Sequence, residues 1–219
     1  MGRPYKWVKG EAGVKRDIEA FKAVREAVGY NFNIMADAND GYEQNFDWAV
    51  RMLRECAPYE MYWMEEIFPE TTKIYRRLHT VLNQSNVKIP IAEGEDVRDV
   101  DQFQSYLEEE LFNFIQPDMR TVGFSNILRG AKMAGEHGVS LIPHNWASEI
   151  GKLMSILCAV IQKNITFAED DRYHTLAIDA SGYLFRDGQW TAPDRPGWGI
   201  RLNDHYDYFQ RNNEEAVIS

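Results

Sequence analysis

The sequence has few cysteines, no strongly basic segment and no long apolar run. Only Cys56 and Cys158 are cysteines among 219 residues, and each falls in a segment with helical spacing of apolar residues. This placement predicts two buried, reduced thiols rather than a disulfide or a thiolate metal site. A net charge of −10 argues against a nucleic-acid partner, because phosphate backbones attract basic stripes.

Membrane and secretory segments are also missing. The longest apolar stretch, residues 154–161, is too short to cross a bilayer, and the N-terminus MGRPYKWVKG has no apolar signal region. We therefore expect a cytoplasmic protein without a membrane partner. With 44% hydrophobic and 13% aromatic residues and no low-complexity tract, the chain can form one substantial globular core.

Ionisable residues end six short apolar runs at near-regular intervals. The steps between them are 28, 30, 23, 26 and 25 residues, which fits one strand, one helix and two short loops. Alternating strands and helices predict an α/β fold with a parallel sheet, and polar strand ends are typical of a (β/α) TIM-type barrel, whose active site lies at the carboxyl ends of the strands. The six residues are Asp37, Glu65, Glu95, Asp118, His144 and Glu169.

Helical periodicity and extended runs alternate over most of the chain. We assign residues 1–175 to a partial barrel domain. Residues 176–219 are rich in Gly, Pro and Trp, and we expect irregular strands and turns that pack back on the barrel within the same domain. The predicted helices are 17–28, 45–56, 70–82, 100–110, 125–136 and 148–161, and the predicted strands include 61–64, 87–92, 112–116, 139–142 and 165–168.

Six strand ends are too few for a closed barrel, which needs eight strands and typically about 250 residues. At most one more strand could precede Asp17. We therefore expect an incomplete barrel that lacks its first strand or strands. Either the chain is a shortened version of a longer protein, or a partner chain or unusual packing covers the opening, because strand edges left unpaired would be exposed.

Three of the acidic strand ends suggest a metal site. If Asp37, Glu65 and Glu95 meet at neighbouring strand tips, their charges repel one another and are costly to bury without a counter-ion. A divalent cation removes both costs. Since the ligands are all carboxylates, with no Cys or His among them, the sequence predicts a hard ion, and Mg²⁺ would leave room for a substrate carboxylate.

The next two strand ends suggest a general base. Asp118 and His144 fall on adjacent strands of the same rim. A hydrogen bond between them would fix the imidazole tautomer and raise the basicity of its other nitrogen. We expect structural roles for the other histidines, which are His79, His137, His174 and His205.

These motifs resemble the mandelate racemase-like branch of the enolase superfamily. IMADAN is similar to that branch's MVDAN strand, WMEE to its WIEE strand, and AEGE to its GE strand. QPD followed by PHNW is similar to its Asp and His pair, and the spacings are close to the family's. The closing DASGY and PDRPGWGIRL resemble the tail of acid-sugar dehydratase-like members. The likeness covers nearly the whole chain from Asp17.

The resemblance implies proton abstraction from the carbon α to a substrate carboxylate, with Mg²⁺ stabilising the product of that step. It most favours dehydration of a sugar acid to a 2-keto-3-deoxy acid, with a racemase, epimerase or cycloisomerase of the same superfamily as alternatives. The implied roles are metal binding by Asp37, Glu65 and Glu95, catalysis by His144, Asp118 and Glu169, and substrate binding by Asn39, Lys6 and Asn145.

Two departures from the family pattern affect these expectations. The branch commonly carries a Lys-x-Lys pair at the end of its second barrel strand. In one register Lys6 matches the first lysine and Val8 stands at the second, whereas another register, which aligns Gly2 and Arg3 with the glycine after the pair, places both lysines upstream of Met1. This disfavours a two-base racemase. The family's N-terminal α+β capping domain has no counterpart here, so we expect the polypeptide alone to bind Mg²⁺ weakly and to turn over acid sugars poorly.

A second class of function stays open alongside the enzyme. The chain could be a catalytically silent barrel remnant that keeps the site residues by descent and serves as an assembly or binding module. An upstream reading frame encoding a Lys-x-Lys and an α+β domain would favour the enzyme. Relatives often form symmetric oligomers, so the resemblance also implies a homo-oligomer.

Overall fold

The fold is built on a parallel five-stranded sheet with helices between successive strands. The computed structural model describes residues 8–203, so Lys6 and His205 lie outside the described part. Strand order follows the sequence, β1-β2-β3-β4-β5, and every neighbouring pair is parallel. This confirms the predicted α/β class. The strands are β1 (Ile34–Asp37), β2 (Met61–Glu65), β3 (Ile91–Glu93), β4 (Phe114–Ile115) and β5 (Ser140–Leu141).

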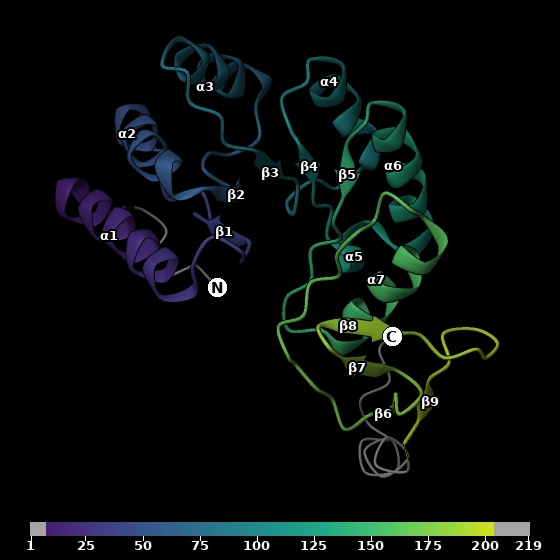
Figure 1. The fold of residues 1–219 in the computed structure, drawn as a ribbon. Helices are drawn as coiled ribbons and strands as arrows, with labels where there is room; N and C mark the ends of the chain where they lie inside the picture. Colours follow the sequence, from purple (N-terminus) through teal and green to yellow (C-terminus); the bar gives the residue numbers. More distant parts are fainter. Residues whose placement is uncertain (1–7, 204–219) are drawn as a thin grey trace, which may run out of the picture.

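The helices follow one another in an arc outside these strands (Figure 1). Each predicted helix is present, with shifted ends. The first begins at Gly10 rather than Asp17, because Gly13 and Val14 are already buried. The third begins after Thr71, which is extended. The helices are α1 (Gly10–Val28), α2 (Phe46–Cys56), α3 (Thr72–Gln84), α4 (Phe103–Glu108, preceded by a 3-10 turn at Val100–Gln102), α5 (Met119–Val122), α6 (Phe124–Glu136) and α7 (Glu149–Ile161).

Side-chain caps set where several helices begin. The Asn45 side chain accepts hydrogen bonds from the backbone N–H groups of Asp47 and Trp48, at 3.0 and 3.1 Å. The Ser148 hydroxyl accepts one from Gly151 at 3.0 Å. These bonds satisfy N–H groups that have no partner within the helix, so each cap fixes the point at which a loop from a strand tip enters its helix.

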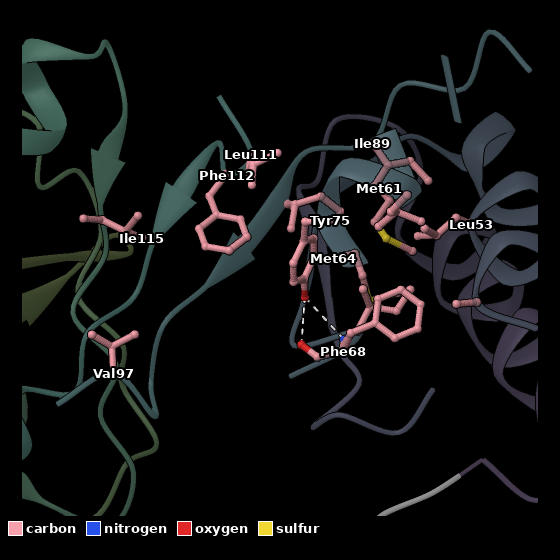
Figure 2. Packing of buried hydrophobic residues seen from close by; sticks show 14 of the residues in the cluster. Leu53, Met61, Met64, Phe68, Tyr75, Ile89, Val97, Leu111, Phe112 and Ile115 are labelled. Carbon is pink, nitrogen blue, oxygen red and sulfur yellow. Dashed lines mark hydrogen bonds between the residues drawn. The ribbon is translucent and has the colours of Figure 1, made fainter. Parts of the chain in front are cut away.

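The main core lies between the sheet and the helices (Figure 2). Leu53 of α2, Met64 of β2 and Phe112 are among its buried side chains. Tyr75 of α3 packs edge-on against Phe112, with ring centroids 5.0 Å apart. Burial of this size supplies the main driving force for folding, since each large apolar side chain contributes about 1.5–3 kcal/mol. The helices are thereby held against one face of the sheet.

The opposite face of the sheet carries a second, aromatic cluster. Trp63 of β2 and Phe114 of β4 lie with ring centroids 4.9 Å apart, and Tyr62 and Phe167 pack beside them. Ala92 and Ile142 complete this cluster. Because alternate strand residues face opposite sides, this is the face that a barrel would enclose.

The predicted sixth strand, 165–168, is wrong as a hydrogen-bonded strand. Residues 162–169 form no strand; they contain a turn at 163–164 and are otherwise irregular. The Leu141 N–H donates to the Asn164 carbonyl at 3.2 Å, and the Asn164 side chain donates to the Ala131 carbonyl at 2.6 Å. These bonds hold the segment beside β5, and Phe167 still packs on the aromatic cluster.

The C-terminal part forms two small antiparallel sheets below the barrel strands (Figure 1). Ile178 and Tyr183 pack with Leu153 and Ile156 of α7 in a separate apolar cluster. The segment thus contacts the last helix; the boundary at residue 176 stays a prediction. Its strands are β6 (Ile178–Asp179), β7 (Leu184–Arg186), β8 (Gln189–Thr191) and β9 (Arg201–Leu202).

Both cysteines are free and fully buried, as predicted. Burial raises the pKa of each thiol to about 12. Cys56 ends α2 and Cys158 lies on α7, so the thiols stand near opposite ends of the sheet. Within residues 8–203, no helix has the length and apolar character needed to cross a membrane.

Candidate active site

A cavity of about 370 Å³ lies at the carboxyl ends of the strands. It brings together side chains that are up to 132 residues apart, from Asp37 to Glu169. This is where parallel strands place loop residues for binding and catalysis. The lining residues are Asp37, Asn39, Glu65, Glu95, Arg120, His144, Trp146 and Glu169.

Asp37 ends β1 and is held by Asn39. The Asn39 backbone N–H donates to Asp37 Oδ1 at 2.7 Å, and the Asn39 side-chain amide donates to Asp37 Oδ2. Asn39 adopts a left-handed conformation with φ of 47°, which asparagine tolerates better than most residues. The predicted substrate-binding residue therefore lines the cavity and also orients a predicted metal ligand.

Glu65 ends β2 and is almost completely buried, with 8% of its surface exposed. The Trp63 indole N–H donates to its Oε2 atom at 3.0 Å. Burial, together with the charges of Asp37 and Glu169, raises the pKa of Glu65 to about 7, despite hydrogen bonds from Gln116 and Trp63 that lower it. A carboxylate crowded by other carboxylates in this way favours a bound cation.

A hydrogen-bonded chain links His144 to two carboxylates. Its Nδ1 atom lies 2.8 Å from Asp118 Oδ2, and its Nε2 atom lies 2.8 Å from Glu95 Oε2. Burial alone lowers the pKa of His144, but the bonds to Asp118 and Glu95 raise it to about 10. The predicted contact between Asp118 and His144 is therefore present, and the imidazole is also bonded to a predicted metal ligand.

Asp118 is buried behind His144 and does not line the cavity. Its Oδ1 atom accepts the backbone N–H groups of Arg120 and Thr121, at 2.7 and 3.0 Å, and so caps α5. Burial raises its pKa, but hydrogen bonds from His144 and Arg120 outweigh that effect and hold the pKa well below its usual range. Asp118 is thus a fixed anion that orients the imidazole.

Glu169 closes the other side of the cavity. Its Oε2 atom accepts the Asn145 backbone N–H at 2.5 Å, and burial raises its pKa. The Asn145 side chain is fully buried outside the lining, and both of its amide atoms lack a partner among the described residues. Its predicted role in substrate binding stays a prediction, as does that of Lys6.

A buried acid behind the site steadies β3. Glu93 is fully buried, and burial holds its pKa well above the usual range. The Tyr75 hydroxyl donates to the Phe68 carbonyl at 2.9 Å, as Figure 2 shows, and it is also paired with Glu93. The pair ties the loop after β2 to the strand that leads to Glu95.

The donor set of the cavity fits a hard cation. Asp37, Glu65 and Glu95 offer carboxylate oxygens, which Mg²⁺ prefers. Within residues 8–203, no three acidic, imidazole or thiol groups already converge on one point. Glu95 is instead bonded to His144. The Oε2 atom of Glu95 could bind an ion only by giving up its bond to the imidazole.

Arg120 and Trp146 are cavity residues that the strand-end pattern did not predict. Arg120 follows Asp118 by two positions, and Trp146 follows His144 by two. Arg120 lies in the short helix α5, which begins directly after Asp118, and Trp146 lies in the loop after His144, so neither is at the strand end itself. The signal that could have found them is the general tendency of loops at this end of a barrel to carry binding side chains.

A family model described as "Enolase C-terminal domain-like" matches residues 3–206. The chain belongs to this family. It is a member of the enolase superfamily in its mandelate racemase-like branch, which confirms the resemblance drawn from the strand motifs. The barrel-type fold of this family agrees with the parallel strands and alternating helices seen here.

Curated relatives of this enolase-superfamily chain include enzymes named for sugar acids or their derivatives. It is 30% identical over 204 residues to D-galactarolactone cycloisomerase of Agrobacterium fabrum, covering 87% of this chain and 52% of the relative. It is 30% identical over 210 residues to arabinonate dehydratase of Saccharolobus solfataricus, covering 91% and 54%. The chain thus spans about half the length of the curated relatives it matches.

Solved structures show the same fold. Galacturonate dehydratase from Geobacillus sp., complexed with D-galacturonate and 5-keto-4-deoxy-D-galacturonate, has a TM-score of 0.83 at 27% identity, covering 97% of this chain and 57% of that one. A mandelate racemase/muconate lactonizing protein from Geobacillus sp. Y412MC10, complexed with magnesium and tartrate, also has a TM-score of 0.83 at 27% identity, covering 97% and 54%.

Proposed function

We propose that this protein is a Mg²⁺-dependent enzyme that removes the proton α to the carboxylate of a sugar acid, with loss of water as the overall reaction. The observation that carries the proposal is His144, held by Asp118 on one nitrogen and facing a carboxylate-lined cavity with the other. An α-proton is too weakly acidic to leave near neutral pH without a positioned base and a nearby positive charge.

The cavity residues divide these tasks. Asp37, Glu65 and Glu95 would hold Mg²⁺, which when bound supplies positive charge beside the substrate carboxylate. Asp118 holds His144 Nδ1, so the Nε2 atom would take the α-proton once Glu95 no longer occupies it. The same imidazolium would then give its proton to the departing β-hydroxyl, which leaves as water. Glu169 would contact the substrate from the opposite wall.

Cycloisomerisation is the second candidate, because the cycloisomerase of Agrobacterium fabrum is a 30% identical relative. Dehydration is favoured by the dehydratases among the relatives, including arabinonate dehydratase. A two-base racemase would need a second base, and Lys6 lies outside the described residues. The described sheet has five strands and two edges, so the active unit would close a barrel with further strands, from a longer chain or a partner.

A substrate screen tests the proposal. The protein in its full natural length is incubated with a panel of aldonic, uronic and aldaric acids and Mg²⁺, and 2-keto-3-deoxy acids are detected as semicarbazones. We expect at least one acid to lose water, and EDTA to abolish that loss. If no acid loses water or exchanges its α-hydrogen with D₂O, the enzyme proposal is wrong and the binding-module alternative is favoured.

Magnesium is also expected to lower the pKa of His144. The metal-free value is about 10, because Glu95 and Asp118 favour the imidazolium. If Glu95 moves from the imidazole to the ion, the pKa of His144 should fall by roughly one unit or more. In the folded protein the pKa of His144 lies above its ordinary value of 6.5. The bonds from His144 to Asp118 and Glu95 therefore stabilise the metal-free fold fully below pH 6.5, and this stabilisation is lost as the pH rises towards 10.

The pKa is measured by following the His144 ring resonance during NMR titrations with and without saturating Mg²⁺. Glu95→Gln provides the control, because its His144 should begin with a lower pKa and respond less to the ion. A His144 pKa that saturating Mg²⁺ leaves unchanged in the unmodified protein would show that Glu95 does not move to the metal.

A further inference from the structure

The cavity contains one permanently charged cation among its described lining residues, Arg120. The other charged lining groups are four carboxylates and the imidazole of His144. An arginine remains protonated throughout the pH range of proteins. If Mg²⁺ were bound by three of these carboxylates, Arg120 would be the second positive centre in the same cavity.

Arg120 is held firmly in position. Its backbone N–H and its Nη2 atom donate to the two oxygens of Asp118, at 2.7 and 3.0 Å. Its Nε and Nη1 atoms make no further hydrogen bond among the described residues, and 48% of the side chain is exposed. The guanidinium therefore presents unused donors to the cavity while one edge is fixed.

The guanidinium is not needed to hold Asp118. That carboxylate already accepts the backbone N–H groups of Arg120 and Thr121 and lies 2.8 Å from His144 Nδ1. A neutral side chain at position 120 would retain these three contacts. An arginine here is therefore better explained by what its exposed donors can bind.

The two positive centres would lie on different strands. Asp37 and Glu65 end β1 and β2, Glu95 follows β3, and Arg120 follows β4. Neighbouring strands are about 4.8 Å apart. The middle of the three metal-ligand strands, β2, therefore lies roughly 10 Å from β4, the strand that precedes Arg120. A carbon chain with an anionic group at each end could contact both centres.

We propose that Arg120 binds the distal carboxylate of the substrate, and that the substrates of this protein are therefore sugar diacids rather than monoacids. This inference rests on the proposed function, since it needs a metal centre to hold the first carboxylate. Arginine suits the task because its planar guanidinium forms paired hydrogen bonds with a carboxylate. The diacid's second charge would otherwise meet a cavity lined by four carboxylates.

The test compares two ligands that differ only at the distal carbon. The protein in its full natural length, carrying His144→Asn to prevent turnover, is titrated calorimetrically in Mg²⁺ with an aldaric acid and with the aldonic acid of the same hydroxyl configuration. Several configurations are compared. We expect the diacid to bind roughly tenfold to a hundredfold more tightly, as for a charged hydrogen bond.

Arg120→Gln should reduce this preference to about one, Arg120→Lys should retain part of it, and Arg98→Gln should leave it unchanged. Arg98 is the matched control because it is 71% exposed, lies beside Thr121 and does not line the cavity. A preference that Arg120→Gln leaves intact overturns the inference. Equal binding of both acids by the Arg120 protein overturns it while the proposed function stands, and binding of neither acid overturns both.

Discussion

Replacing His144 with asparagine is expected to lower turnover of the sugar acid by roughly a hundredfold to ten-thousandfold. Asparagine cannot take up the proton, although its amide can still hydrogen-bond to Asp118 or Glu95, which contact the imidazole at 2.8 Å. Exchange of the substrate's α-hydrogen with D₂O should fall together with turnover, because both need the same base. Rates are measured by NMR in D₂O with saturating Mg²⁺.

His137→Asn is the matched control for this variant. His137 is exposed at the end of α6 and does not line the cavity. Its replacement should leave both rates within about twofold of the parent, as is usual for exposed positions. If His144→Asn stopped dehydration but left α-hydrogen exchange intact, another group would be the base and His144 would act only on the leaving hydroxyl.

Replacing Glu65 with glutamine is expected to have opposite effects on metal binding and on metal-free stability. Mg²⁺ affinity should fall by about a hundredfold or more, since loss of even an outer partner of a ligand can cost that much. The metal-free fold should become more stable at pH 8 by about 1–3 kcal/mol, because burial raises the pKa of Glu65 to about 7.

The sign follows from the protons bound in each state. Between pH 4.5, the ordinary value, and about 7, folded Glu65 holds a proton that the unfolded chain has lost, so stability falls as pH rises. Glutamine has no such proton. Urea unfolding in EDTA at pH 5 and pH 8 measures the difference, with the exposed Glu136→Gln as control. Equal pH dependence in the parent and Glu65→Gln would contradict the proposed environment of Glu65.

Much of the architecture was predictable because burial leaves a local mark on the sequence. Asp37 and Glu65 each end a short apolar run, and the structure places both at strand ends. Helices such as Phe46–Cys56 could be predicted from the helical spacing of their apolar residues. These features depend on residues close together in the chain, so one sequence suffices to predict them.

The remainder depended on contacts between distant segments. Residues 165–168 have the composition of a strand, yet whether they form a ladder depends on their alignment with β5. The bond from His144 to Glu95 joins residues 49 positions apart and changes which partner the imidazole has before a metal binds. Arg120 was overlooked because its importance comes from the cavity it lines, and not from any pattern around it.

The two inaccessible sulfur atoms provide an intrinsic reporter of how this fold opens. Cys56 and Cys158 are fully buried, one at the end of α2 and the other within α7, and these two helices pack near opposite margins of the sheet. Alkylating reagents attack thiolates, so modification must await local or global opening. Comparing the labelling rates of the two sites would reveal whether both margins come apart in one cooperative event or separately.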